Sequence, residues 1–156
     1  MATTTVFNLR LGGRVDFWIT PVPAARPRVG KFGTYYPKKY AQFRKEFGAM
    51  IEKADLPKPS VLPVAVYLEF VLPRPKNPSN PYPMGDTDNY VKSVLDSIQG
   101  HAVFADDKQV VFEAGFKRYA AKGEEPHITM LIGDMDGIDD VLQQEDTVSI
   151  KELCNV

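Results

Sequence analysis

Alternation of apolar and polar residues predicts several β-strands along the chain. The first covers residues 14–20, where Val15, Phe17 and Ile19 alternate with polar positions. Further strands are predicted over four short stretches, residues 34–36, 64–72, 110–119 and 127–132.

Apolar residues spaced three and four positions apart predict two helices. The first begins at Pro37, a residue suited to the first helical turn, and ends near Ala54. The second begins at Asp88 or its neighbour and ends near Gln99, where Gly100 follows. Strands interleaved with two helices predict an α+β domain, a two-layer sandwich in which the helices pack on one face of a mixed sheet.

Proline-rich loops separate these elements and carry basic residues. Residues 21–33 form a predicted loop in which prolines hold an extended backbone around Arg26 and Arg28. The strand over residues 64–72 leads into a second loop, which contains five prolines together with Arg74 and Lys76.

The composition is that of a single globular domain, with 156 residues, 44% of them apolar and 25% charged. The single Cys154 excludes an internal disulfide, and two histidines without a cysteine cluster exclude the usual structural zinc sites. Pro63 and Glu69 interrupt the longest apolar run, and the first ten residues lack the apolar core of a signal sequence. We therefore expect a soluble cytoplasmic protein with no membrane partner.

Charge is distributed unevenly, although the net charge is −1. Residues 1–132 contain 18 basic and 13 acidic residues, whereas residues 133–156 contain one basic and seven acidic residues. We expect one domain over residues 1–133 and an acidic tail over residues 134–156, with a short helix around residues 138–144.

Basic residues are concentrated in residues 17–45, which contain no acid. This asymmetry indicates a surface that binds phosphate groups. The candidates for contact with a nucleic-acid backbone are Arg26, Arg28, Lys31, Lys38, Lys39, Arg74 and Lys76. An alternative for Lys38 and Lys39 is that they only solvate a helix face.

Two carboxylates precede the second helix and suggest a metal site. With one residue between them in extended backbone, Asp86 and Asp88 leave the chain on the same side and repel each other unless a cation or hydrogen-bond donors intervene. Oxygen ligands at this density suit Mg²⁺ or Mn²⁺. A Ca²⁺ loop is excluded, because Val91 stands where its glycine belongs and Ser97 where its glutamate belongs. The alternative is that Asp88 only caps the helix.

Further charged residues follow on the helix and after it. Lys92 lies one turn beyond Asp88, either as part of a surface charge ladder with Asp96 or as a lysine that reaches a phosphate over a metal site. Asp106 and Asp107 come directly after the apolar pair Val103 and Phe104, which we expect to anchor their loop to the core. An Asp-rich turn is the alternative for this pair. Glu69, on the strand before the site, is a possible extra ligand, although an ordinary sheet-face glutamate is the simpler interpretation.

Taken together, these segments resemble one known family. The pattern Asp-x-Asp-Asn-x-x-Lys from Asp86, followed by Val-Phe-x-Asp-Asp-x-Gln-Val from Val103, is similar to that of the RusA Holliday junction resolvases. The earlier Pro-x-Pro-x-x-Arg-Pro-Arg segment and Tyr-Pro-Lys-Lys-Tyr also resemble that family. The resemblance covers roughly residues 20–132. The chain departs from the family at two places: residues 82–85, just before Asp86, contain no basic residue, and the acidic tail is not typical of the family.

The resemblance implies a homodimeric, Mg²⁺-dependent endonuclease that nicks four-way DNA junctions symmetrically and uses no nucleotide cofactor. It implies metal ligation by Asp86, Asp88 and Asp107, with Lys92 as a catalytic or phosphate-contacting residue and Asp106 ranked below Asp107. It also implies a bacterial or phage-infected cell as the setting. The alternatives are a metal-dependent nuclease for other branched or flap DNA, and a non-catalytic DNA-binding module.

Overall fold

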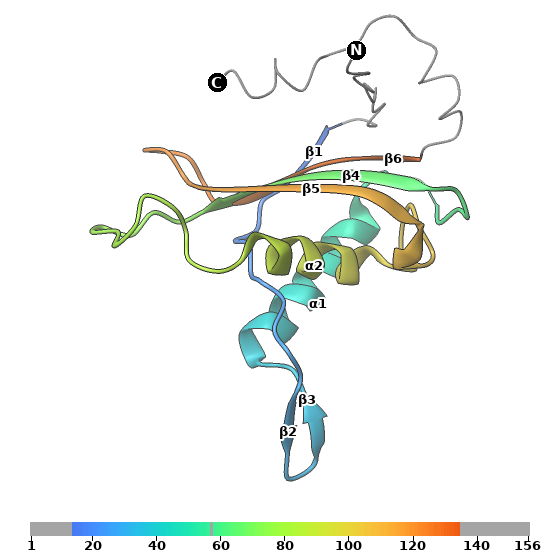
Figure 1. Ribbon diagram of the computed structural model, residues 1–156, viewed down its shortest axis with the longest axis horizontal. Coiled ribbons are helices and arrows are strands. Elements are labelled where there is room, and N and C mark those ends of the chain that lie inside the picture. Colours follow the sequence, from blue (N-terminus) through green and yellow to red (C-terminus); the bar gives the residue numbers. More distant parts are fainter. Residues whose placement is uncertain (1–13, 57, 135–156) are drawn as a thin grey trace, which may run out of the picture.

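The computed structural model describes residues 14–56 and 58–134. A four-stranded sheet in the order β1–β6–β4–β5 forms the centre of this part of the chain (Figure 1). Its strands are β1 (Arg14–Phe17), β4 (Val64–Leu72), β5 (Val110–Tyr119) and β6 (His127–Asp134). β6 pairs antiparallel with both β1 and β4, whereas β4 pairs parallel with β5, so the sheet is mixed.

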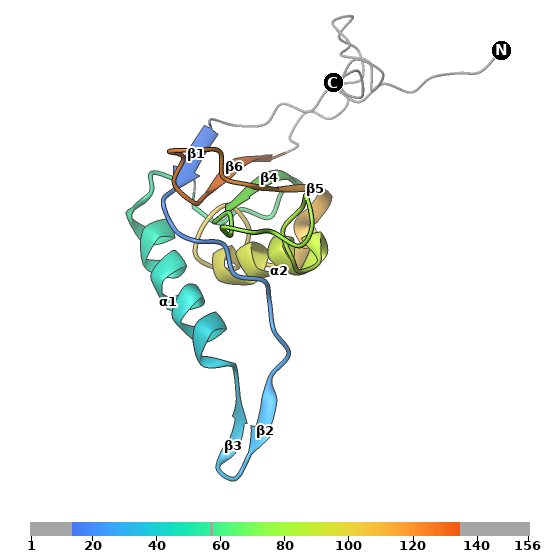
Figure 2. The same cartoon turned by 90° about the vertical axis from the view of Figure 1, so that its left-hand side faces the viewer.

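Two helices cover one face of this sheet, α1 (Lys38–Lys53) and α2 (Thr87–Ile98) (Figure 2). α2 lies between β4 and β5 in the chain and forms part of their connection. Parallel strands need a crossover connection of this kind, because a tight hairpin turn can join only antiparallel strands. The predicted two-layer α+β architecture, with both helices on one face of a mixed sheet, is confirmed.

The core lies between the sheet and the helices. Phe47 of α1, Phe70 of β4 and Val94 of α2 are fully buried there. Ring contacts join the layers, since the Phe17 ring meets Phe47 edge-on at 5.0 Å between centroids and Phe70 lies 5.4 Å from Tyr90. Such close-packed contacts hold α2 in a fixed position on the sheet.

A separate hairpin projects from the helix side of the molecule (Figures 1 and 2). It consists of β2 (Arg28–Gly30) and β3 (Gly33–Tyr35), which pair antiparallel around a two-residue turn, Lys31 and Phe32. We call residues 28–35 the arm.

Apart from shifts of one or two residues at element ends, the structure differs from the sequence predictions at three places. β1 ends at Phe17 because the amide of Ile19 bonds back to the Phe17 carbonyl and turns the chain. β2 was not predicted, since three residues are too few to show a period. A single 3₁₀ turn, η1 (Asp107–Gln109), was also missed. The helix expected around residues 138–144 lies outside the described residues.

Within the described residues, no helix is long and apolar enough to cross a membrane.

Candidate active site

The start of α2 leaves two carboxylates unused by the helix. Asp86 is the N-cap residue, but its side chain makes no capping hydrogen bond; the amides of Asn89 and Tyr90 bond instead to its main-chain carbonyl. Asp88 lies in the first turn and is not the cap. Both side chains are exposed, and among the described residues neither forms an ion pair. The capping alternative for Asp88 therefore does not describe this helix.

The loop that leads into Asp86 is held from two sides. The Tyr90 hydroxyl donates to the Met84 carbonyl at 3.0 Å. The Lys117 ammonium, from β5, donates to the carbonyls of Pro83 and Gly85. Gly85 has a φ of 91°, and a Cβ there would also meet the Tyr90 ring at 3.1 Å. These contacts fix the direction in which the chain enters α2.

The loop after α2 is anchored as the sequence predicted. Phe104 is fully buried and Val103 is 4% exposed, so both belong to the core. Asp106 caps η1, accepting a hydrogen bond from the Lys108 amide, while the Gln109 side chain accepts from the Asp106 amide. That backbone hydrogen bond from Lys108 is the main cause of the lowered pKa of Asp106. Asp106 thus stabilises the turn, as the Asp-rich-turn alternative proposed for it.

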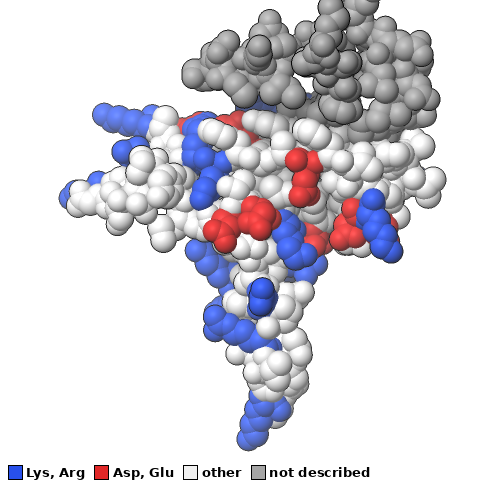
Figure 3. Space-filling view, viewed as in Figure 1, with Lys and Arg blue, Asp and Glu red and all other residues white. Residues whose placement is uncertain are grey.

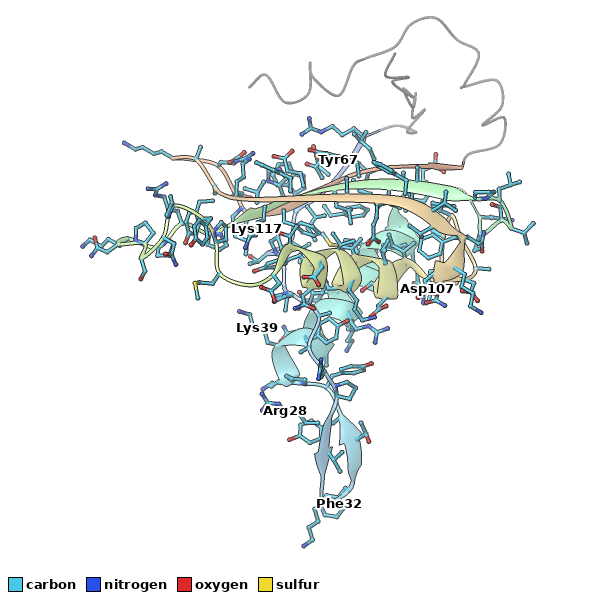
Figure 4. The ribbon with its side chains drawn as sticks, viewed as in Figure 1. Arg28, Phe32, Lys39, Tyr67, Asp107 and Lys117 are labelled. Atoms are coloured by element: carbon cyan, nitrogen blue, oxygen red, sulfur yellow. The ribbon has the colours of Figure 1, made fainter. Side chains whose placement is uncertain are left out.

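An open groove of about 490 Å³ runs along α2 and brings these segments together. Carboxylates from three elements line it, Asp88 and Asp96 on α2, Asp107 on η1 and Glu113 on β5. Lys92 lies among them. Gly115, in the middle of β5, faces Thr87 and Val91 near the beginning of α2. The beginning of β5 and the preceding η1 therefore lie toward the C-terminal end of α2, where Figure 4 labels Asp107. The acids are spread along the groove.

Lys92 is paired with Asp96, one turn further along α2, with 3.3 Å between nitrogen and oxygen. This is the surface charge ladder that the sequence allowed. Asp96 also faces Tyr40 of α1; burial of the ring and, next, the charge of Asp96 raise the pKa of Tyr40 to about 12. Lys92 therefore stands at the groove with its ammonium held by an acid that is not one of the predicted metal ligands.

The comparison with protein families identifies the chain. The sequence model described as Endodeoxyribonuclease RusA matches residues 19–132. The chain belongs to the RusA family. It is an endonuclease of the Holliday junction resolvase class, and the nucleases of this family depend on divalent metal ions. No curated protein matches the chain in a sequence search.

The acids of this RusA-family chain fit a hard divalent cation in kind, because they are exposed carboxylates with unused oxygens. They are not gathered at one point. Among residues 14–56 and 58–134, no three His, Cys, Asp or Glu side chains are arranged to hold a metal ion. Asp88 and Asp107 line the same groove, whereas Asp86 is not among its lining residues. The convergence of Asp86, Asp88 and Asp107 that the resemblance implies is thus not seen in the described residues.

Glu69 is separated from the groove by the sheet. Its neighbour Phe70 is in the core against α2, so alternation turns Glu69 to the opposite face. There its carboxylate accepts from Arg118 at 2.9 Å. The possible role of Glu69 as a metal ligand is therefore corrected: it is an ordinary sheet-face glutamate paired with an arginine.

The basic candidates fall into two groups. Arg26, Arg28, Lys31, Lys38 and Lys39 are exposed on the arm and on the segments that flank it, and Figure 3 shows Lys and Arg side chains along this projection. The second group, Arg74 and Lys76, is exposed on the loop after β4. Arg74 also lies over the Tyr119 ring at 5.8 Å.

Glu113 and Lys117 are the two residues near this RusA-family groove that the sequence analysis missed. Both lie on β5 and share with Gly115 the face that the helices cover, as alternation requires. The sequence pattern that could have revealed them is Gly115 with a charged residue two positions away on each side. A charged side chain on a strand face that helices cover needs polar partners there.

Proposed function

We propose that this RusA-family endonuclease resolves four-way DNA junctions by paired symmetric nicks in a Mg²⁺-dependent reaction, acting as a homodimer in the cytoplasm. The observation that carries the proposal is the groove along α2, which Asp88 and Lys92 line together with Asp107 from a later segment of the chain. Two nicks placed symmetrically across a junction need two active sites related by a two-fold axis, which a dimer of identical chains supplies.

In this proposal Asp86, Asp88 and Asp107 hold the cation. Mg²⁺ prefers oxygen ligands, and Mn²⁺ shares that preference. When bound, the ion activates water and stabilises charge on the phosphate. Glu113 lies on the same groove and is an additional carboxylate for an ion or for a water in its shell.

Lys92 has a separate role in the proposed reaction. A phosphodiester resists attack because its negative charge repels the nucleophile, and a nearby ammonium lowers that barrier by stabilising the charge that develops. Lys92 has an exposed side chain on the groove, where it pairs with Asp96. When the phosphate binds, the Lys92 ammonium leaves Asp96 and contacts the phosphate. Exposed pairs of this kind are worth little, so the exchange costs little.

The basic side chains of the arm and its flanks contact the DNA backbone in this proposal. Such contacts make affinity fall steeply with salt and depend little on sequence, which suits a substrate recognised by its shape.

The decisive experiment compares single substitutions on a panel of DNA substrates. We expect Asp86→Asn, Asp88→Asn and Asp107→Asn each to lower cleavage of a four-way junction by at least 100-fold while junction binding survives. Asp55→Asn, at an exposed acid outside the groove, is the matched control. Calorimetric titration with Mg²⁺ gives a readout independent of cleavage, and it should show weaker binding in the Asp86, Asp88 and Asp107 variants but not in the control.

The substrate panel contains four-way, three-way, flap and linear DNA. Preferential paired nicking of the four-way junction supports the proposal. Stronger cleavage of flaps or three-way DNA would assign the same groove to another branched substrate. If the wild-type chain neither binds Mg²⁺ nor nicks any DNA, the nuclease proposal is wrong and a non-catalytic DNA-binding module is the remaining interpretation.

A further inference from the structure

The arm buries none of its own strand residues. All six residues of β2 and β3 are exposed, and at the turn Phe32 is 98% exposed. Val29, one residue before Gly30, is 86% exposed. A lone two-stranded hairpin is marginal in water, and exposed apolar residues gathered on it add nothing to the core. The sequence of the arm therefore serves something outside the fold.

The segments before and after the arm, residues 24 and 44, are attached to α2. On the entering side, the Ala24 amide bonds to the Asn89 carbonyl at 2.8 Å, one residue after Asp88. On the leaving side, Arg44 donates to the Asp96 carbonyl at 3.3 Å. The same guanidinium lies over the rings of Tyr36 and Tyr40, at 5.5 and 5.9 Å. The position of the arm is thus set by the helix that carries the groove acids.

The chemistry of the arm fits a nucleic acid with an accessible base. The Lys31 ammonium lies 5.8 Å from the Phe32 ring centroid, and Arg28 is exposed at the other end of β2, so phosphate-binding groups flank an aromatic tip (Figure 4). No acid occurs in residues 17–45, so two such arms would repel each other. Linear duplex DNA keeps its base faces stacked, whereas a branch point exposes them, and aromatic rings bind exposed faces by stacking.

We propose that Phe32 stacks on a base at the branch point of a four-way junction, while Arg28 and Lys31 contact the flanking phosphates. On this basis the arm is the element that distinguishes branched from linear DNA, and its attachment to α2 sets the distance from the branch point to the cleaved bond. The inference rests on the proposed function, whose substrate preference it explains.

The test uses the full chain in EDTA, so that binding is measured without cleavage. The probes are a four-way junction with 2-aminopurine beside the branch point and a linear duplex with the same label. Phe32→Ala is expected to lower junction affinity about tenfold, to leave duplex affinity unchanged and to abolish the fluorescence rise that unstacking produces. Phe32→Trp should restore the junction affinity. Val61→Ala, at an apolar residue that is 89% exposed before β4, is the matched control and should behave as wild type.

Several results would overturn the inference. They include wild-type affinity and fluorescence in Phe32→Ala, or an equal loss on junction and duplex, which would make the tip a general backbone contact. Sedimentation of Phe32→Ala as a monomer beside a dimeric wild type would assign the arm to contact between copies. If the wild-type chain itself fails to prefer the junction, the proposed function falls first and this inference falls with it. A wild-type chain that prefers the junction while Phe32→Ala does too would overturn the inference alone.

Discussion

At the scale of single residues, Lys117 links the sheet to the loop that leads into Asp86. Its ammonium bonds to the carbonyls of Pro83 and Gly85 and lies 5.9 Å from the Tyr82 ring, which fixes the approach to Asp86. Charge-assisted hydrogen bonds are stronger than neutral ones, so the loss of this group should loosen the loop. Lys117 is therefore a positioning residue.

We expect Lys117→Met to lower cleavage about 10- to 100-fold, because small displacements of a reacting group are costly. The half-saturating Mg²⁺ concentration should rise as well, since Asp86 would be less firmly placed. The measurement is initial cleavage rate against Mg²⁺ concentration, with Lys122→Met, at an exposed lysine beyond β5, as the control. An unchanged Mg²⁺ dependence in Lys117→Met would show that the lysine has only a structural role.

Candidate site residues could be predicted from the sequence where local spacing indicates their role. The helix period placed Lys92 one turn from Asp88, and the resemblance to the RusA family joined Asp107 to them; the structure puts all three on one groove. The sequence could not decide that Asp106, and not Asp107, would cap the turn, because that depends on Gln109 closing the turn. Lys117 was out of reach because its partners are main-chain carbonyls, which every residue carries.

At the scale of elements, the contact between α2 and β5 is made possible by Gly115. A Cβ at this position would lie 2.6 Å from a Val91 methyl carbon and 3.0 Å from that of Thr87. Both distances are shorter than van der Waals contact, so any larger side chain must push the first turns of α2 away from the sheet. These turns carry Asp88.

Gly115→Val should destabilise the protein by about 1–3 kcal/mol through overpacking and should also reduce cleavage. Urea unfolding followed by circular dichroism measures the first effect. Gly48→Ala provides the opposite case, because nothing lies within 4 Å of the added carbon. Since Gly48 lies in the interior of α1, alanine should raise the free energy of unfolding by about 0.5–1 kcal/mol. A neutral Gly115→Val variant would contradict the close approach.

The connection between β5 and β6 is stabilised by a charge network on the outer face of the sheet. Arg118 donates to Glu69 and, through both terminal nitrogens, to Glu124. The hydrogen bond from Arg118 lowers the pKa of Glu124 from its usual 4.5 to about 2. Because the folded pKa is the lower one, this group stabilises the fold above pH about 4.5, and the contribution is lost as the pH falls to about 2.

Glu124→Gln should therefore lower the free energy of unfolding near pH 6, and the difference from wild type should disappear as the pH approaches 2. Urea unfolding at a series of pH values measures it. Glu125→Gln, at the exposed neighbour, is the matched control. A difference for Glu124→Gln that stays constant with pH would exclude the ion pair as the cause.

At the scale of the whole molecule, the proposed dimer determines how many strands are cut. Subunits of wild type mixed with Asp88→Asn should form hybrid dimers with one active site. Such dimers are expected to nick a single strand of a four-way junction held in a supercoiled plasmid, giving open circles in place of linear product. Sedimentation of the wild type establishes the assembly, and undiminished paired cutting by a monomer would refute it.

The architecture was predictable to a greater extent than the site geometry. Periods of two and of three to four residues located β4, β5, β6 and both helices, because these elements are long enough to repeat a pattern. In the arm, the sequence predicted a strand near β3 but missed β2, because β2 has no buried face and no alternation marks it. The spacing of the acids along α2 depended on strand register, which local sequence does not specify.

The crossover between β4 and β5 has a consequence for how this enzyme can be switched off. The segment that connects the parallel strands is also the one that contains Asp86, Asp88 and Lys92, so removing it would break the edge of the sheet. Deletion or truncation would then give an unfolded chain in place of an inert one. A stable dominant-negative form, able to occupy junctions without cutting them, is therefore accessible only through exchanges of individual side chains.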